Sequence, residues 1–165
     1  MHGISIARLS VLLLAFAGAS AHAHEHDKAH DLHTATVAQA AQASWGIAGK
    51  RDGAQRTIRM SMLDSMHFAP EKIEVKRGET VRFLIRNDGA LLHEFVLGTK
   101  ATLDEHARMM AQQPNMPHEA DYMAHVDPGK TGEVVWTFNR VGQFYYACLV
   151  AGHYEAGMIG TVLVK

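Results

Sequence analysis

The chain has 165 residues, of which 47% are hydrophobic, so it is long enough and apolar enough for one folded domain with one core. Its formal net charge of −1, from 16 basic and 17 acidic residues, gives no basis for binding nucleic acid or an anionic membrane surface. The single cysteine, Cys148, excludes an internal disulfide; in an exported chain this thiol is either open to oxidation or committed to a task such as metal binding.

The first 23 residues have the pattern of a secretory signal peptide. Arg8 is the basic element, residues 9–17 form a short apolar run, and small residues follow up to two A-x-A cleavage patterns at 19–21 and 21–23. The apolar run is too short to span a bilayer. We therefore expect export to the periplasm and a mature chain without a membrane span, with an uncleaved anchor as the alternative.

Residues 24–54 are expected to form a flexible tail rich in Ala, Gln, His and Gly. Its few large apolar residues include Trp45 and Ile47, which are candidates for docking on the domain that follows. Depending on whether the chain is cut after residue 21 or 23, His24 or His26 is the third residue of the mature protein. The terminal amine, two backbone amides and this imidazole can then make the square-planar nitrogen set that Cu(II) prefers. A solvated His-rich tail without a fixed role is the alternative.

Residues 55–165 have the pattern of short strands separated by turns. Alternation of polar and apolar residues predicts strands over 57–62, 73–76, 80–86, 94–97, 133–138, 143–147 and 159–164. Turn signals stand at 87–89 and 127–129. Short strands at this spacing are typical of an antiparallel sandwich or barrel, so the expected class is an all-β Greek-key sandwich.

One segment, 101–113, has helical rather than strand spacing. Leu103, Ala107 and Met110 fall on one face, and Pro114 ends the segment. Thr102, with Glu105 three residues later, is the expected capping box. The sequence therefore predicts one short helix inserted in the sandwich.

The most informative segment lies between the last two predicted strands, where Cys148, His153 and Met158 have the spacing C-x4-H-x4-M. His93 lies far upstream, at the head of a predicted strand. Two imidazoles, one thiolate and one weak axial thioether suit a copper ion that changes between Cu(I) and Cu(II). The pattern predicts one mononuclear type 1 copper site.

These residues also admit other interpretations. Each residue taken alone fits a buried free cysteine, surface histidines or a packed methionine. Zinc matches the set less well, because methionine is a poor zinc ligand and only three good donors would remain. No Ser-His-Asp or paired-carboxylate arrangement stands out, and four ligands leave no open position for a substrate, so we expect no enzymatic activity.

From about residue 57 to residue 165 the chain resembles the cupredoxin family. The four residues of the predicted copper site match the family's ligands one for one, and residues 78–81 match its turn into a strand. Within the family, residues 93–95, the inserted helix with Met109 and Met110, and residues 152–160 are most similar to the periplasmic copper-tolerance cupredoxins of the CopI type.

The chain departs from the family pattern at two positions beside the ligands. Ala151 stands where many members have a proline before the Gly-His of the ligand loop. Glu94 stands where several members have an Asn or Ser that braces this loop. The resemblance therefore does not carry over the bracing hydrogen bond, the colour of the site or its reduction potential.

Further methionines and histidines are candidates for accessory copper sites, because thioethers favour Cu(I). One group precedes residue 68 and the other follows the helix: Met60, Met62, Met66 and His67, and Met116, His118, Met123 and His125. Alternation of Met60 and Met62 along a strand is also what core packing produces.

Two functions fit this pattern. The resemblance to CopI implies copper tolerance, in which the protein binds, buffers or oxidises excess periplasmic copper. The alternative is a soluble electron carrier between a cytochrome and a terminal reductase or oxidase. For that role we expect an apolar patch for a redox partner around His153, formed by Leu91, Leu92, Ala151 and Gly157.

Overall fold

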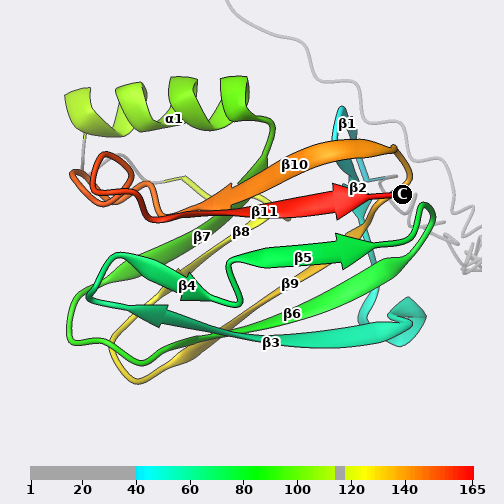
Figure 1. Ribbon diagram of the computed structural model, residues 1–165, viewed down its shortest axis with the longest axis horizontal. Helices are drawn as coiled ribbons and strands as arrows, with labels where there is room; N and C mark the ends of the chain where they lie inside the picture. Colours follow the sequence, from blue (N-terminus) through cyan, green and yellow to red (C-terminus); the bar gives the residue numbers. More distant parts are fainter. Residues whose placement is uncertain (1–39, 114–117) are drawn as a thin grey trace, which may run out of the picture. The chain divides into compact units, whose positions relative to one another are not determined.

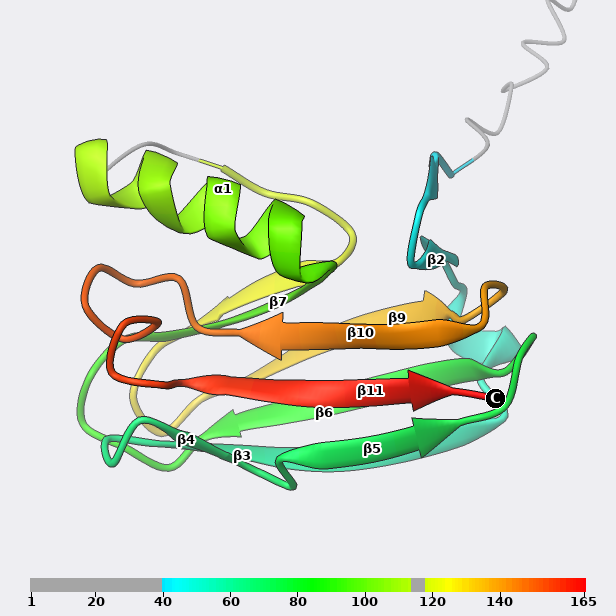
Figure 2. The ribbon, with the colours of Figure 1, turned by 45° about the horizontal axis from the view of Figure 1, so that its top comes forward.

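The structure, a computed structural model, describes residues 40–113 and 118–165. In these ranges two β-sheets pack face to face, and one helix lies on the outside of one of them (Figure 1 and Figure 2). The predicted signal peptide and the candidate copper residues His24, His26 and Met116 lie outside the described residues. Among the described residues no helix is long and apolar enough to cross a membrane.

The first sheet has six strands. In spatial order they are β1 (Gln42–Ala43), β2 (Gly46–Ala48), β9 (Thr131–Thr137), β6 (Thr80–Asn87), β3 (Arg56–Leu63) and β4 (His67–Ala69). The second sheet has five: β5 (Lys72–Val75), β11 (Ile159–Val164), β10 (Gly142–Ala147), β7 (His93–Gly98) and β8 (Met123–Val126). The expected all-β sandwich with one inserted helix is confirmed.

Two strand pairs differ from the antiparallel arrangement that the sequence predicted. β3 pairs with β6 and β5 pairs with β11 in parallel, whereas the other pairs are antiparallel. The chain passes from β3 and β4 in the first sheet to β5 in the second and back to β6. Such a crossover connection lets two neighbouring strands run in the same direction.

The folded part begins earlier than residue 55. Residues 42–48, which were expected to belong to a flexible tail, form β1 and β2, and β2 pairs with β9. Trp45 is only 8% exposed, its ring stacks on that of Trp136 at 6.2 Å between centroids, and Trp136 Nε1 donates to its carbonyl oxygen at 3.2 Å. The sequence of β1 and β2 has little alternation of polar and apolar residues. Burial of the large Trp45 side chain therefore explains best why this segment forms strands on the domain.

The helix α1 spans Lys100–Gln112, one residue earlier at each end than predicted. Its N-cap is Thr99, whose side chain accepts from the backbone N–H of Thr102, so the expected cap at Thr102 with Glu105 is wrong by one helical turn. Leu103, Ala107 and Met110 are buried, as predicted, and pack in a small core against β7, β8 and β10.

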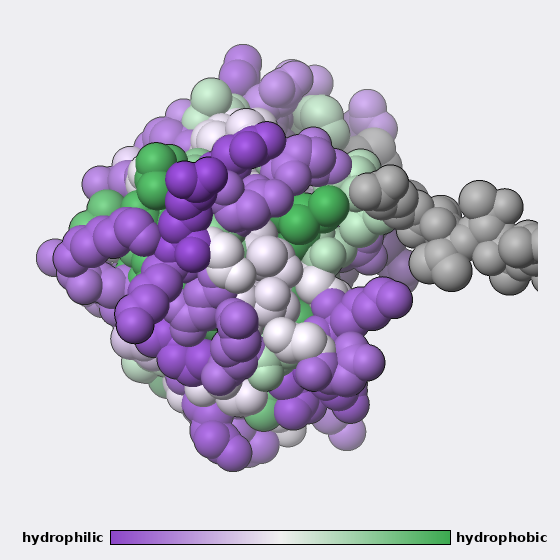
Figure 3. All heavy atoms as spheres, turned by 90° about the vertical axis from the view of Figure 1, so that its right-hand side faces the viewer, coloured by the Kyte–Doolittle hydropathy of each residue, from purple (hydrophilic) through white to green (hydrophobic). Residues whose placement is uncertain are grey.

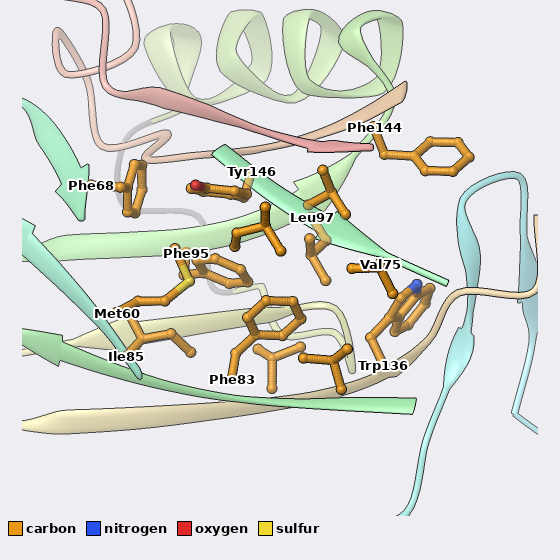
Figure 4. Packing of buried hydrophobic residues seen from close by; sticks show 14 of the residues in the cluster. Met60, Phe68, Val75, Phe83, Ile85, Phe95, Leu97, Trp136, Phe144 and Tyr146 are labelled. Atoms are coloured by element: carbon orange, nitrogen blue, oxygen red, sulfur yellow. The ribbon is translucent and has the colours of Figure 1, made fainter. Parts of the chain in front are cut away.

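The main core fills the space between the two sheets (Figure 4). The ring of Tyr146 meets the edge of Phe68 at 5.1 Å and stacks on Phe95 at 5.3 Å. Met60 and Met62 belong to this core, being 2% and 0% exposed, so their alternation reflects packing. This packing fixes β7 and β10 to the core, and the predicted copper ligands lie at one end of these two strands.

Candidate metal centre

The four predicted ligands come from one end of the sandwich. His93 opens β7, Cys148 directly follows β10, and Met158 directly precedes β11. The loop that joins β10 to β11 therefore carries three of the four residues, and in Figure 1 it lies at the left end of the sandwich, below α1. The register of β7 and β10 places Val96 opposite Ala147, so the upstream histidine and the ligand loop lie beside each other.

Three of these side chains converge on one point. The Sγ atom of Cys148 lies 3.3 Å from Nδ1 of His153 and 3.8 Å from Nδ1 of His93. One ligand atom from each of the three lies within 4.8 Å of the others, and the two imidazole centroids are 4.9 Å apart. A thiol and two imidazoles that each present Nδ1 to the same small space can hold a soft or borderline metal ion.

The centre is largely shielded from water. His93, Cys148 and Met158 are fully buried, whereas His153 is half-buried and forms the edge toward solvent. Burial raises the pKa of the Cys148 thiol to about 11, so a metal ion that binds the thiolate must displace a proton. Burial and the nearby His93 imidazole lower the pKa of His153, which favours the neutral ring that can bind a metal.

Met158 is tied to the other ligands through its backbone. Its N–H donates to the carbonyl of His153 at 3.0 Å, and its carbonyl accepts from the N–H of Cys148 at 3.1 Å. Its side chain belongs to the same core cluster as that of Cys148. The two ends of the loop are therefore hydrogen-bonded to each other, and Met158 lies next to Cys148.

Asp64, which no sequence pattern singled out, orients the upstream histidine. Its carboxylate accepts from Nε2 of His93 at 3.0 Å and from the backbone N–H groups of Ala90 and Leu91 at 2.7 and 3.3 Å. A proton held on Nε2 leaves the lone pair of Nδ1 facing Cys148, which is the tautomer a metal needs. A Cβ on Gly89 would lie 2.0 Å from this carboxylate, so glycine is required for the close approach.

The same contacts keep the Asp64 carboxylate charged. The backbone N–H of Ala90, followed by the side chain of His93, lowers the pKa of Asp64 below its ordinary value. No local sequence pattern predicts the role of Asp64, because it follows β3 while its partners lie just before β7 and at the first residue of β7.

Asn87 braces the connection between β6 and β7. It is fully buried, and its Nδ2 donates to the carbonyls of Leu91 and Val126 at 2.7 and 2.8 Å. Its Oδ1 accepts from the N–H of Gly89 at 2.9 Å. The sequence pattern predicted only a turn at this residue. In the structure its side chain fixes the loop between β6 and β7, which positions His93.

Glu94 contacts the ligand loop through its backbone and not through its carboxylate. Its backbone N–H donates to Cys148 Sγ at 3.3 Å, whereas its carboxylate oxygen Oε1 lies 2.7 Å from Nε2 of His125 on the neighbouring strand β8. The ligand loop is instead bound to α1 through Tyr154. The Tyr154 O–H donates to Asp104 at 2.7 Å, and Nζ of Lys100 lies 5.3 Å from the centroid of the Tyr154 ring. The inserted helix thus anchors the ligand loop.

The four residues expected to form an apolar patch around His153 are exposed. Leu91 and Leu92 are 46% and 43% exposed, and Ala151 and Gly157 of the ligand loop are exposed as well. The opposite end of the sandwich, which faces the viewer in Figure 3, is covered largely by hydrophilic side chains with small, separated hydrophobic patches. The proposal of a docking patch therefore rests on the exposure of these four residues.

The accessory candidates are dispersed. Met66 is half-buried against the core, and His67 is exposed, with Nδ1 donating to the carbonyl of Ser65. Met123 is buried under α1, and His118 lies with His125 and not with a methionine cluster. Among the described residues the structure therefore brings the second group of histidines together, but not the methionines around them.

Comparison with known proteins shows the family of the chain. The family of copper-binding proteins described as plastocyanin/azurin matches residues 56–165. The copper-resistant cuproprotein CopI of Rubrivivax gelatinosus is 44% identical over 97% of this chain and 98% of its own length. CopI of Pseudomonas aeruginosa is 36% identical over 96% of this chain and 95% of its own length.

Solved structures with the same fold are less similar in sequence. Auracyanin from Roseiflexus castenholzii covers 68% of this chain and 99% of its own, with a TM-score of 0.58 and 20% identity. Auracyanin B covers 78% of this chain and 99% of its own, with a TM-score of 0.57 and 22% identity. At this level of identity the likeness concerns the fold.

Proposed function

Because the chain belongs to the plastocyanin/azurin family of copper-binding proteins, we propose that it serves copper resistance by holding one copper ion at the buried end of its sandwich. The observation that carries the proposal is the approach of two imidazole Nδ1 atoms to one cysteine Sγ at 3.3 and 3.8 Å. Two relatives that match nearly the full chain are copper-resistant cuproproteins, and this supports the proposed biological role.

The proposed ligands are the two imidazoles, the thiolate and the buried thioether: His93, Cys148, His153 and Met158. Copper bound there can pass between Cu(I) and Cu(II) by accepting or losing one electron. The residues supply a fixed set of soft and borderline donors, so little rearrangement is needed at either charge.

Residues that contact the four proposed ligands orient them or tune the bound copper. Asp64 keeps the proton of His93 on Nε2, and the N–H of Glu94 donates to the Cys148 sulfur. Hydrogen bonds to a ligand sulfur withdraw electron density from it and tune the reduction potential of the metal. Tyr154 holds the ligand loop on α1 through Asp104.

The protein is proposed to act as a binding and redox protein without a catalytic step of its own. A second role as an electron carrier is favoured by one observation, the exposed Leu91 and Leu92 beside the half-buried His153. An apolar surface at the metal edge suits brief docking of a redox partner such as a cytochrome, reductase or oxidase. The two roles use the same chemistry and are compatible.

The proposed location is the periplasm. The basis is the pattern of residues 1–23, with a basic residue, a short apolar run and an A-x-A cleavage pattern. An oxidising compartment also suits a chain whose only thiol would be protected by copper and by burial.

Growth of a bacterial strain that lacks its own relative of this protein tests the biological role. We expect the wild-type gene to restore growth on copper, Cys148→Ser to fail, and the control His67→Gln, an exposed histidine on β4, to restore it fully. Restoration by Cys148→Ser would contradict the proposal. A respiratory defect at low copper, without copper sensitivity, would instead support the electron carrier.

A further inference from the structure

A second group of metal-binding side chains lies on the outer face of the second sheet. Glu94 on β7 and His125 on β8 are directly opposite in the strand register, and His118 lies just before β8. Since successive side chains of a strand point to opposite faces, Glu94 points away from the face occupied by His93 and Phe95 and toward α1. His106 reaches the same place from the helix.

The donor atoms of this group converge as closely as those of the first site. One carboxylate oxygen, Glu94 Oε1, lies 2.7 Å from Nε2 of His125 and 4.0 Å from Nε2 of His118. One ligand atom from each residue lies within 4.8 Å of the others. The ring of His118 is flanked by His106 and His125, with centroids 4.8 and 4.9 Å away.

Burial of the carboxylate is the second observation. Glu94 is only 2% exposed, and its Oε2 is buried without a hydrogen-bond partner among the described residues. An ionised carboxylate removed from water is costly unless both oxygens find partners. A simple ion pair with His125 satisfies one oxygen, but it accounts neither for the other oxygen nor for two more imidazoles gathered beside it.

We propose that Glu94, His118 and His125 form a second metal site that takes Cu(II), with the imidazole of His106 within reach as a further donor. Nitrogen and oxygen donors of this kind suit divalent first-row metals, among which Cu(II) binds most tightly. The set contains neither cysteine nor methionine, so it lacks the soft donors that favour Cu(I). The site goes beyond the proposed function and does not depend on it, because it shares no ligand with the first site.

The two sites are nevertheless connected through the backbone of β7. The residue after His93 supplies a carboxylate to the second site and an N–H to the sulfur of the first. A cation bound by the Glu94 carboxylate therefore acts on a residue whose peptide group touches Cys148. In the wild-type protein, filling the second site should shift the thiolate-to-copper band of the first.

The test uses the full mature chain and counts copper. In the parent protein the tail histidines His24, His26, His30 and His33 are replaced by glutamine so that they contribute no copper, and so is His22 where the chain is cut after residue 21. The double variant His118→Gln/His125→Gln and the single variant Glu94→Gln are compared with this parent, and His67→Gln is the matched control. Each protein is titrated with Cu(II), desalted, and examined by elemental analysis and electron paramagnetic resonance.

We expect the parent to show a second copper signal with nitrogen couplings, distinct from that of the first site. The double variant and Glu94→Gln should each hold one copper ion per chain fewer than the parent and lose this signal, whereas His67→Gln should match the parent. Retention of the thiolate-to-copper band shows that the variants are folded. A double variant that holds as much copper as the parent, or a parent without the second signal, would overturn the proposal.

Cys148→Ser separates this proposal from the first one. In that variant the thiolate band is lost, and the second signal should remain. If the thiolate band is absent from the parent while the second signal is present, the proposed function fails and the second site stands. If the reverse is seen, the second site fails alone.

Discussion

Replacing Asp64 with alanine removes the carboxylate that holds Nε2 of His93 and two backbone N–H groups of the preceding loop. His93 is then free to carry its proton on Nδ1, the atom that faces Cys148 at 3.8 Å, and the loop loses its anchor. Loss of a residue that orients a metal-bound histidine typically lowers metal affinity by about 10- to 100-fold. We expect a loss of copper affinity in this range, measured by competition with a chromophoric Cu(I) chelator.

Asp88→Ala is the matched control, because Asp88 lies in the loop between β6 and β7 that Asp64 anchors but pairs with Arg86 at the surface. It should leave copper affinity within about twofold of wild type. Urea unfolding of each apoprotein separates loss of the fold from loss of the site. If Asp64→Ala binds copper as tightly as Asp88→Ala does, the assignment of Asp64 to the orientation of His93 is refuted.

Three further changes test other parts of the account. Tyr154→Phe removes the hydrogen bond to Asp104, so copper should pass to a chelator faster by up to about 10-fold, with an unchanged spectrum; an unchanged rate would contradict the anchoring of the loop. Gly160→Ala places a Cβ 2.2 Å from the buried Tyr146 ring, and urea unfolding of the apoprotein should show a loss of about 1–3 kcal/mol; wild-type stability would mean that the ring moves freely. The folded-state pKa of Asp64 lies below its ordinary value of 3.8, so its contribution to stability is present above this pH and is lost as pH falls through the lower folded pKa. The stability difference between apo wild type and Asp64→Asn should therefore shrink as the pH falls from about 5 to below 3.8, and a constant difference would contradict the ionised carboxylate.

The parts of the site that follow from sequence are those built from local spacing. Cys148, His153 and Met158 share one loop, and alternation along the neighbouring strands is enough to predict that this loop lies at a strand end. The Glu94–His125 pair depends on the register of β7 and β8, and Asp64 reaches His93 from the turn after β3, which belongs to the other sheet. The register between two strands cannot be predicted from a single sequence with this accuracy. An error of one residue in register places every side chain of the strand on the opposite face.

The position of the domain boundary has a similar explanation. Trp45 is an isolated apolar residue in a polar segment, and its partner Trp136 lies 91 residues away. Nothing in the local pattern distinguishes a docked tryptophan from one in a tail. The parallel pairing of β3 with β6 likewise follows from a crossover between sheets, not from the alternation within either strand.

The central claim is that Cys148 and the two histidines bind copper together, and the visible and electron paramagnetic resonance spectra of the Cu(II)-loaded protein test it most directly. The account predicts an intense thiolate-to-copper band and a type 1 resonance in the wild type, both absent from Cys148→Ser. A colourless wild-type protein, or a band that survives in Cys148→Ser, would contradict it.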